Sequence, residues 1–336
     1  LEHCSSLHTN WLVRETISHY NERGSTVYLG SLDVAKAFDT IWHNGFFYML
    51  HKLGLDEKIW RLIVKSYTGF KCCVSIGGIN SELFQVDQGF HQGAPFSMTG
   101  FNLYDNILIK SLTDSLCGLR IEDMKLVCPA FADDIVVMST NISSLQTLMD
   151  LVYCFSCKWR LNFNANKCAL VVYGRDNTPL KDLTLGRSII KRKPAHTYLG
   201  TLLSAQTNEM KNYVTSRIQA TKGSAYNIKA IGSRIAPVTP ISASHVYKTV
   251  CLPKLLYGME LMPCSDESID QLENFQASVA KAIQRLPDRC TNMGAVRTMG
   301  WLSIRNIINI TRLIFLWKLI LLPISCLYTK CWYLDI

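Results

Sequence analysis

Apolar and polar positions along the chain predict a mixture of strands and helices. The segment 27–32 is apolar enough for a buried strand, and the spacing then turns helical over 42–50. Two further runs of β-forming residues lie at 135–138 and 169–173. Residues 206–325 read as mainly helical. The order of these patterns predicts a sheet-containing region followed by a helical one.

Two adjacent carboxylates, Asp133 and Asp134, stand directly before the strand predicted at 135–138. Because β-forming residues flank them on both sides, we predict the tight turn of a hairpin with the acids at its tip. Carboxylates on rigid strands suit a divalent metal site, since hard cations such as Mg²⁺ take oxygen ligands. A solvated turn would explain the pair equally well.

Asp33 ends the strand predicted at 27–32 and gives the acidic pair a third partner. If that strand lies beside the hairpin, Asp33 and Asp133 could share metals. Two metals about 3.5–4 Å apart can activate a 3′ hydroxyl and stabilise a pyrophosphate leaving group. The alternative is that Asp33 caps the helix that follows it.

A loop punctuated by Gly93 and Pro95 lies between the acidic elements, and helical spacing follows over 101–108. The backbone at Gly93 and the polar side chains of Gln92 and Ser97 would suit a surface that senses the nascent base pair. The alternative is an ordinary start of a helix, with Ser97 as its cap.

Together these elements resemble the palm of a reverse transcriptase. The motifs are, in order, LDVAKAFD (32–39), HQGAPFS (91–97), FADD (131–134), WRLNFNANKC (159–168) and YLG (198–200). The likeness is to the non-LTR (LINE-type, jockey-like) retrotransposon enzymes of animals, and a looser one continues over 252–258. A group II intron maturase or a telomerase would share the acids, but LDVAKAFDTIWHNG favours the retrotransposon type.

The resemblance implies a role for each matching residue. Asp33, Asp133 and Asp134 would be catalytic and hold two Mg²⁺ ions, with Mn²⁺ as a substitute. Lys167 matches the lysine proposed to protonate the departing pyrophosphate. The ring of Phe38 would clash with a ribose 2′-hydroxyl and so favour deoxynucleotides. The nucleotide-binding positions would be Val34, Phe38, Gln92, Gly93 and Ser97.

The implied partners are an RNA template, a DNA primer and deoxynucleoside triphosphates. A formal net charge of +9 suits a polyanionic partner, and residues 181–235 carry ten basic side chains against two acids. Phosphate contacts of this kind supply affinity rather than sequence choice. The nucleic-acid-binding positions would be Lys191, Arg192, Lys193, Tyr198, Leu199 and Gly200, the last three in a hairpin that grips the primer end. The sequence identifies no protein partner.

The fold class implied is α+β: a polymerase right-hand palm, with an antiparallel sheet and helices on one face. We expect a partial fingers helix over 1–26, the palm with finger segments over 27–205, and a helical thumb or connecting region over 206–336. The implied activity is that of an RNA-directed DNA polymerase, a nucleotidyltransferase. The alternative is a catalytically inactive remnant that still binds nucleic acid.

The ends of the chain carry the remaining expectations. The sequence begins at Leu1, inside the expected fingers and without an endonuclease module, so we expect an N-terminally truncated piece of a longer element. It shows no signal peptide, which favours an intracellular protein of the cytoplasm or nucleus that is not secreted. The apolar segment 313–324 is shorter than the roughly 20 residues of a spanning helix, so we predict a buried or amphipathic helix and no membrane.

Overall fold

The computed structural model describes residues 5–91, 93–121, 124–175, 182–204, 209–234 and 239–322, with 336 residues in the chain. The chain folds into two compact units. The sheet unit is Glu15–His196, and the helical unit combines Leu1–Arg14 with Thr197–Ile336. The assignment of fingers, palm and thumb made from the sequence remains a prediction.

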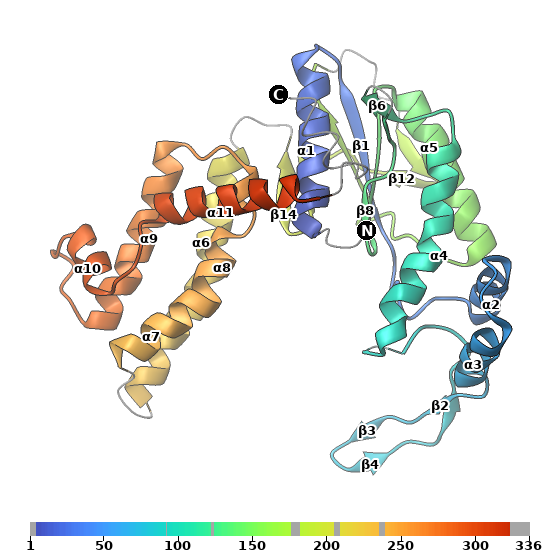
Figure 1. Cartoon of the computed structure of the whole chain (residues 1–336), viewed down its shortest axis with the longest axis horizontal. Helices are drawn as coiled ribbons and strands as arrows, with labels where there is room; N and C mark the ends of the chain where they lie inside the picture. The colour runs from blue at the N-terminus through green and yellow to red at the C-terminus, as the bar shows by residue number, and fades with distance from the viewer. Residues whose placement is uncertain are drawn as a thin grey trace. The chain divides into compact units, whose positions relative to one another are not determined.

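A four-stranded antiparallel sheet is the centre of the sheet unit (Figure 1). Its strands are β1 (Val27–Asp33), β8 (Ala130–Phe131), β9 (Asp134–Ser139) and β10 (Ala169–Tyr173), in the order β10-β1-β9-β8. Strand β1 therefore pairs on both sides, with Leu29 opposite Val171 on one side and Met138 on the other. The buried strands predicted at 27–32, 135–138 and 169–173 are confirmed.

Helices cover this sheet and close its core. The helices of the sheet unit are α2 (His43–Lys52), α3 (Glu57–Tyr67), α4 (Pro95–Asp114) and α5 (Ile142–Trp159). Helix α5 turns Leu145, Met149 and Val152 inward, and they join one hydrophobic cluster with the strands and with α4. Gly30 in β1 makes room for α5, because a Cβ there would lie 3.1 Å from Val137 and 3.5 Å from the sulfur of Met149. The α+β class is confirmed.

Short two-stranded ribbons complete the sheet unit. Their strands are β2 (Lys71–Cys72) with β5 (Phe84–Gln85), β3 (Ser75–Ile76) with β4 (Ile79–Asn80), β6 (Leu119–Ile121) with β7 (Met124–Leu126), and β11 (Leu183–Leu185) with β12 (Ser188–Ile190). The ribbon formed by β2 to β5 extends from the end of α3 and has an exposed tip (Figure 1). Gly77 and Gly78, both with positive φ, form that tip.

The helical unit has its own cores. Its elements include the hairpin of β13 (Ala195–Tyr198) and β14 (Thr201–Ser204), helices α6 (Glu209–Arg234), α7 (Pro240–Val246), α8 (Leu252–Leu256), α9 (Asp266–Gln284), α10 (Asn292–Thr298) and α11 (Ile304–Ile320), and a π-helix at Tyr247–Cys251. Helix α1 (Ser6–Glu22) starts in this unit, and β13 ends in it. Tyr247 and Trp301 stack with ring centroids 4.2 Å apart within one core.

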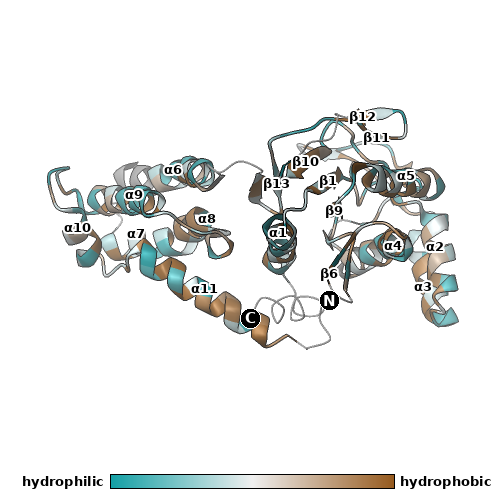
Figure 2. Ribbon diagram, turned by 90° about the horizontal axis from the view of Figure 1, so that it is seen from above, coloured by the Kyte–Doolittle hydropathy of each residue, from teal (hydrophilic) through white to brown (hydrophobic). Residues whose placement is uncertain are grey.

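The apolar segment near the C-terminus forms the last helix, α11. Phe315 and Leu319 are buried, whereas Leu313 and Trp317 are exposed, so its apolar residues surround the helix (Figure 2). In the described ranges, no helix is long and apolar enough to cross a membrane. The predicted helix is confirmed up to Ile320, and residues 323 and 324 lie outside the described ranges.

Candidate active site

The three acids singled out from the sequence meet at one end of the central sheet. Asp33 is the last residue of β1 and pairs directly across the ladder with Asp134, the first residue of β9. Asp133 stands in the turn between β8 and β9, beside Ala132, whose φ of +54° lets the chain reverse in two residues. The predicted hairpin is confirmed. Antiparallel pairing places the Asp33 and Asp134 Cβ atoms about 4.5–5.5 Å apart.

The segment before β10 holds the end of β1 in place. The backbone N–H of Asn164 donates to the carbonyl oxygen of Asp33 at 2.9 Å, and the Asp33 N–H lies 3.5 Å from the Cys168 sulfur. Lys167, at the end of the same turn, places its Nζ 3.5 Å from Asp33 Oδ2. The next helix after Asp33 is α2, with Trp42 as its N-cap, so the alternative that Asp33 is a helix cap is wrong.

Negative charge accumulates at this end of the sheet. Burial and then the neighbouring charges of Asp133 and Asp33 raise the pKa of Asp134 above its ordinary value. Asp33 Oδ2 is buried and accepts no hydrogen bond from a described residue. Like-charged carboxylates with unfilled acceptor capacity have the donor chemistry of a hard divalent cation site. Across the described ranges, however, no three acidic, His or Cys side chains already stand in a metal-binding arrangement.

Asp105 is a fourth acid at this site that the sequence analysis did not single out. It lies on α4, its side chain is 2% exposed, and its Oδ1 finds no hydrogen-bond partner among the described residues. Burial, and secondly the charge of Asp133, raises the pKa of Asp105 to about 7. Its position could have been a signal, because Asp105 falls on the apolar helical stripe that contains Phe101 and Leu108.

Val34 and Phe38 lie in the segment after β1. Val34 is buried and forms an isolated bridge with Phe163, while the half-buried ring of Phe38 packs against Phe101 with centroids 5.0 Å apart. The Phe38 ring is therefore part of the edge of the core. Its role as a gate against ribose remains a prediction.

The loop before α4 differs in detail from its predicted form. Helix α4 begins at Pro95 with Ala94 as N-cap, so the alternative that Ser97 caps it is wrong. Ser97 is buried and its hydroxyl donates to the His91 carbonyl at 2.6 Å. Gly93 has φ of +85° with open space beside it, and Gln92 lies outside the described residues.

The candidate nucleic-acid-binding residues fall in both units. In the sheet unit, Lys191 and Arg192 are exposed and Lys193 is half-buried, and their backbone runs along β10 through hydrogen bonds with Leu170. In the helical unit, Tyr198 is buried at the end of β13, and Leu199 and Gly200 form the turn to β14, with φ of +47° and +75°. The structure therefore assigns the two groups to different units.

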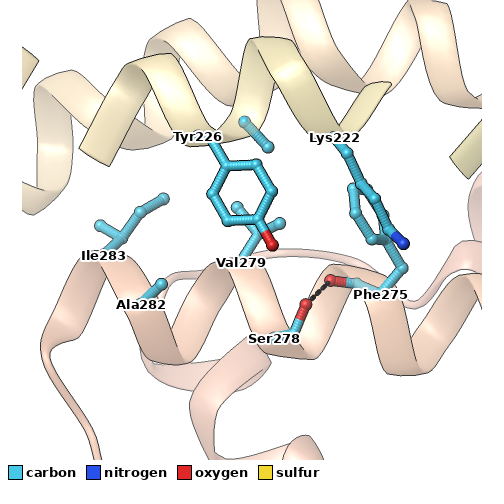
Figure 3. A pocket seen from close by; sticks show the side chains of 8 residues that line it. Lys222, Tyr226, Phe275, Ser278, Val279, Ala282 and Ile283 are labelled. Carbon is cyan, nitrogen blue, oxygen red and sulfur yellow. Dashed lines mark hydrogen bonds between the residues drawn. The ribbon is translucent and has the colours of Figure 1, made fainter. Parts of the chain in front are cut away.

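A pocket of about 130 Å³ lies between α6 and α9 in the helical unit (Figure 3). Figure 3 shows Tyr226 and Lys222 entering from α6, with Val279 and Ile283 facing them from α9. Its lining is mostly apolar, and the hydroxyl of Ser278 donates to the carbonyl oxygen of Phe275 on its own helix. Since few polar groups converge on this pocket, it lacks the recognition groups of a typical small-molecule site.

The family described as "Reverse transcriptase (RNA-dependent DNA polymerase)" matches residues 2–203. The chain is 25% identical over 245 residues to the "Retrovirus-related Pol polyprotein from type-1 retrotransposable element R2" of Popillia japonica, covering 71% of this chain and 39% of that protein. It is 23% identical over 269 residues to the "RNA-directed DNA polymerase from mobile element jockey" of Drosophila funebris, covering 77% and 29%.

The chain therefore belongs to the reverse transcriptase family, and the resemblance to the non-LTR retrotransposon type is confirmed. It spans about a third of the length of these curated relatives. Among solved structures, an apo telomerase from Candida tropicalis, truncated from its C-terminal domain, is similar with a TM-score of 0.43 and 16% identity, covering 59% of this chain and 38% of that one. That likeness is too low to assign a function.

Proposed function

We propose that this chain is an RNA-directed DNA polymerase module of a non-LTR retrotransposon, a nucleotidyltransferase that adds deoxynucleotides to the 3′ end of a primer. Membership of the reverse transcriptase family supports the reaction class. The observation that carries the proposal is the pairing of Asp33 with Asp134 across β1 and β9, with Asp133 in the adjoining turn.

Asp33, Asp133 and Asp134 would hold two Mg²⁺ ions, or Mn²⁺ in their place. When bound, such ions activate the attacking 3′ hydroxyl and neutralise charge on the phosphates. Lys167 would donate a proton to the departing pyrophosphate, and its Nζ already lies 3.5 Å from Asp33 Oδ2. Phe38, packed on Phe101, would set the edge of the sugar pocket, beside which Val34, Gln92, Gly93 and Ser97 would contact the nucleotide.

The substrates would be an RNA template, a DNA primer and deoxynucleoside triphosphates. The exposed cations Lys191 and Arg192, with Lys193 beside them, would contact phosphates of the duplex. The YLG turn (Tyr198, Leu199 and Gly200) would contact the primer near its 3′ end. Both contacts are with the nucleic-acid backbone and would carry little sequence preference.

The test is Mg²⁺-dependent extension of a DNA primer on an RNA template. The variant is Asp133→Asn, which keeps the shape of the side chain and removes its charge. We expect extension to fall by about a thousandfold or more, because several kcal/mol of charge stabilisation depend on the ions. Asp150→Asn is the matched control, since Asp150 is an exposed acid on α5 whose carboxylate accepts a hydrogen bond from Gln146 of the same helix.

Three outcomes separate the possibilities. Extension by the parent and by Asp150→Asn, with none by Asp133→Asn, supports the polymerase and the role of the acid together. Equal extension by all three proteins contradicts the role of Asp133. No extension by any of them, with salt-sensitive binding of the primer–template duplex intact, would favour the inactive nucleic-acid-binding remnant.

A further inference from the structure

The YLG turn is held by side chains from three distant parts of the helical unit. The Nδ2 of Asn10 on α1 donates to the Tyr198 carbonyl at 3.0 Å. The hydroxyl of Tyr257, which follows α8, donates to the Leu199 carbonyl at 2.9 Å. The guanidinium of Arg217 on α6 donates to the Gly200 carbonyl. Three consecutive backbone carbonyls are thus each fixed by a different side chain.

These donors are themselves fixed. The Arg217 guanidinium lies over the ring of Tyr213, 4.9 Å from its centroid, and over that of Tyr257, 5.6 Å from its centroid. The Tyr213 hydroxyl in turn donates to the Tyr257 carbonyl at 2.5 Å. Asn10 also donates to the buried hydroxyl of Thr201, at 2.6 Å. A side chain whose rotamer is fixed in this way also fixes the position of the group that it contacts.

Two glycines bring the interacting segments into close contact. A Cβ on Gly200 would lie 3.0 Å from the ring of Tyr257, and a Cβ on Gly258 would lie 2.6 Å from the Thr201 side chain. Both glycines have positive φ, +75° and +77°. The YLG turn and the segment that contains Tyr257 therefore fit together through a glycine on each side, and a substitution on either side would push them apart.

The three fixed carbonyls determine what the turn presents on its other side. A trans peptide is planar, so the carbonyl of one residue and the N–H of the next point in opposite directions. With the Tyr198 and Leu199 carbonyls bonded to Asn10 and Tyr257, the N–H groups of Leu199 and Gly200 point away from those two side chains. Backbone N–H groups in a turn are donors suited to a phosphate.

We propose that Tyr257, Arg217 and Asn10 are positioning residues that fix the YLG turn in the orientation with which it meets the primer. This inference rests on the proposed function, in which the YLG turn contacts the primer near its 3′ end. Because the turn would hold the 3′ end of the primer, loosening it would disturb the reacting geometry more than it weakens overall duplex binding. Small errors in the placement of reacting groups are costly in rate.

The test is Tyr257→Phe, which keeps the ring against Gly200 and removes only the hydroxyl. We expect kcat for primer extension to fall about tenfold, while the Kd for the primer–template duplex, measured in EDTA, and the melting temperature change little. The matched control is Tyr247→Phe, because the Tyr247 hydroxyl is buried in another core of the same unit with no partner among the described residues. This control should extend primers like the parent.

Hydrogen exchange tests, without any catalytic turnover, whether Tyr257 holds the YLG turn. In the protein without nucleic acid, we expect the backbone amides of residues 198–204 to exchange several-fold faster in Tyr257→Phe than in the parent or in Tyr247→Phe. If the parent extends no primer, the proposed function fails, but this exchange measurement still decides whether Tyr257 holds the turn. Unchanged exchange and unchanged kcat would overturn the inference. A fall in kcat matched by an equal loss of folded protein would also overturn it.

Discussion

Two tight turns of this chain meet opposite physical demands. The turn at Ala132 and Asp133 gathers carboxylates, and burial together with their repulsion raises the pKa of Asp134. The turn at Leu199 and Gly200 carries no charge, and its carbonyls are matched by donors from the side chains around it. The carboxylates at the first turn repel one another, whereas the carbonyls of the second turn are hydrogen-bonded within the protein.

The difference shows how each turn contributes to a site. In the acidic turn, the ladder of β1 and β9 fixes where the carboxylates lie, and their charge is available for a ligand. In the YLG turn, the side chains of Asn10, Arg217 and Tyr257 donate hydrogen bonds to the backbone carbonyls. The backbone of the turn is then the part that could contact a ligand. In the proposed function, charge would provide binding energy in the first case, and rigidity would provide geometry in the second.

After Asp133→Asn, the largest effect is expected from removing the positive charge of Lys167, whose Nζ lies 3.5 Å from Asp33 Oδ2. In Lys167→Gln, kcat for extension should fall by about 100-fold if this lysine is the proton donor. The melting temperature should hardly change, because the Lys167 side chain is 67% exposed and exposed ion pairs add about 0–1 kcal/mol. Steady-state extension assays check the rate, with Lys158→Gln, another exposed lysine, as control. An equal effect of both substitutions would contradict a special role for Lys167.

The next effect concerns the buried acid next to the acidic turn. Because the pKa of Asp105 is raised to about 7 from 3.8, the native state binds more protons than the unfolded state between these values, and its stability falls as pH rises through this window. Asp105→Asn cannot ionise. We expect the variant to gain about 1–3 kcal/mol over the parent between pH 5 and pH 7, at about 1.4 kcal/mol per pKa unit.

Denaturant unfolding at pH 5, 6, 7 and 8, in EDTA so that no divalent ion interferes, measures this gap. Asp150→Asn, at an exposed acid on α5, provides the control against which the gap for Asp105→Asn is compared. A gap between Asp105→Asn and the parent that stays constant over the whole range would show that Asp105 is not the group whose ionisation destabilises the fold.

The smallest effect is expected at the clamped turn. Gly200→Ala places a Cβ in a left-handed conformation and 3.0 Å from the Tyr257 ring, which should cost about 1–2 kcal/mol in the free energy of unfolding. Gly223→Ala on α6 is the matched control, because a Cβ there meets open space. In a helix that change should stabilise by about 0.5–1 kcal/mol. Equal urea-unfolding midpoints for the two variants would show that the turn is looser than the structure indicates.

Local patterns were sufficient to predict much of the sheet unit. The strand at 27–32, the acidic hairpin and the helix after Gly93 and Pro95 each depend on neighbours in the sequence, and each is present in the structure. From the sequence, Asp33 was placed beside the acidic hairpin, but its pairing with Asp134 was not predicted, because the two residues are about a hundred positions apart. The roles of these acids came from the resemblance to reverse transcriptases, because hydrophobic periodicity alone does not assign them.

The remaining features depend on packing between distant segments. Asp105 was passed over because a helical stripe shows which face is buried, but not that a carboxylate on it will face Asp133. Tyr257 and Leu199 are 58 residues apart, and nothing in either segment indicates their contact. The cap alternatives for Asp33 and Ser97 failed for a similar reason, since both residues suit caps but the helices begin elsewhere.

The three side-chain hydrogen bonds that hold the YLG turn have a consequence for which substitutions this protein can accept during evolution. Because Asn10, Arg217 and Tyr257 donate to backbone oxygens, which every amino acid possesses, these hydrogen bonds do not depend on the side chain of Leu199. Substitutions of Leu199 would therefore be tolerated more readily than substitutions of Asn10, Arg217 or Tyr257. In a lineage of such retrotransposons, selection for a fixed YLG turn would act on positions 10, 217 and 257. These positions are far in the sequence from the YLG motif itself.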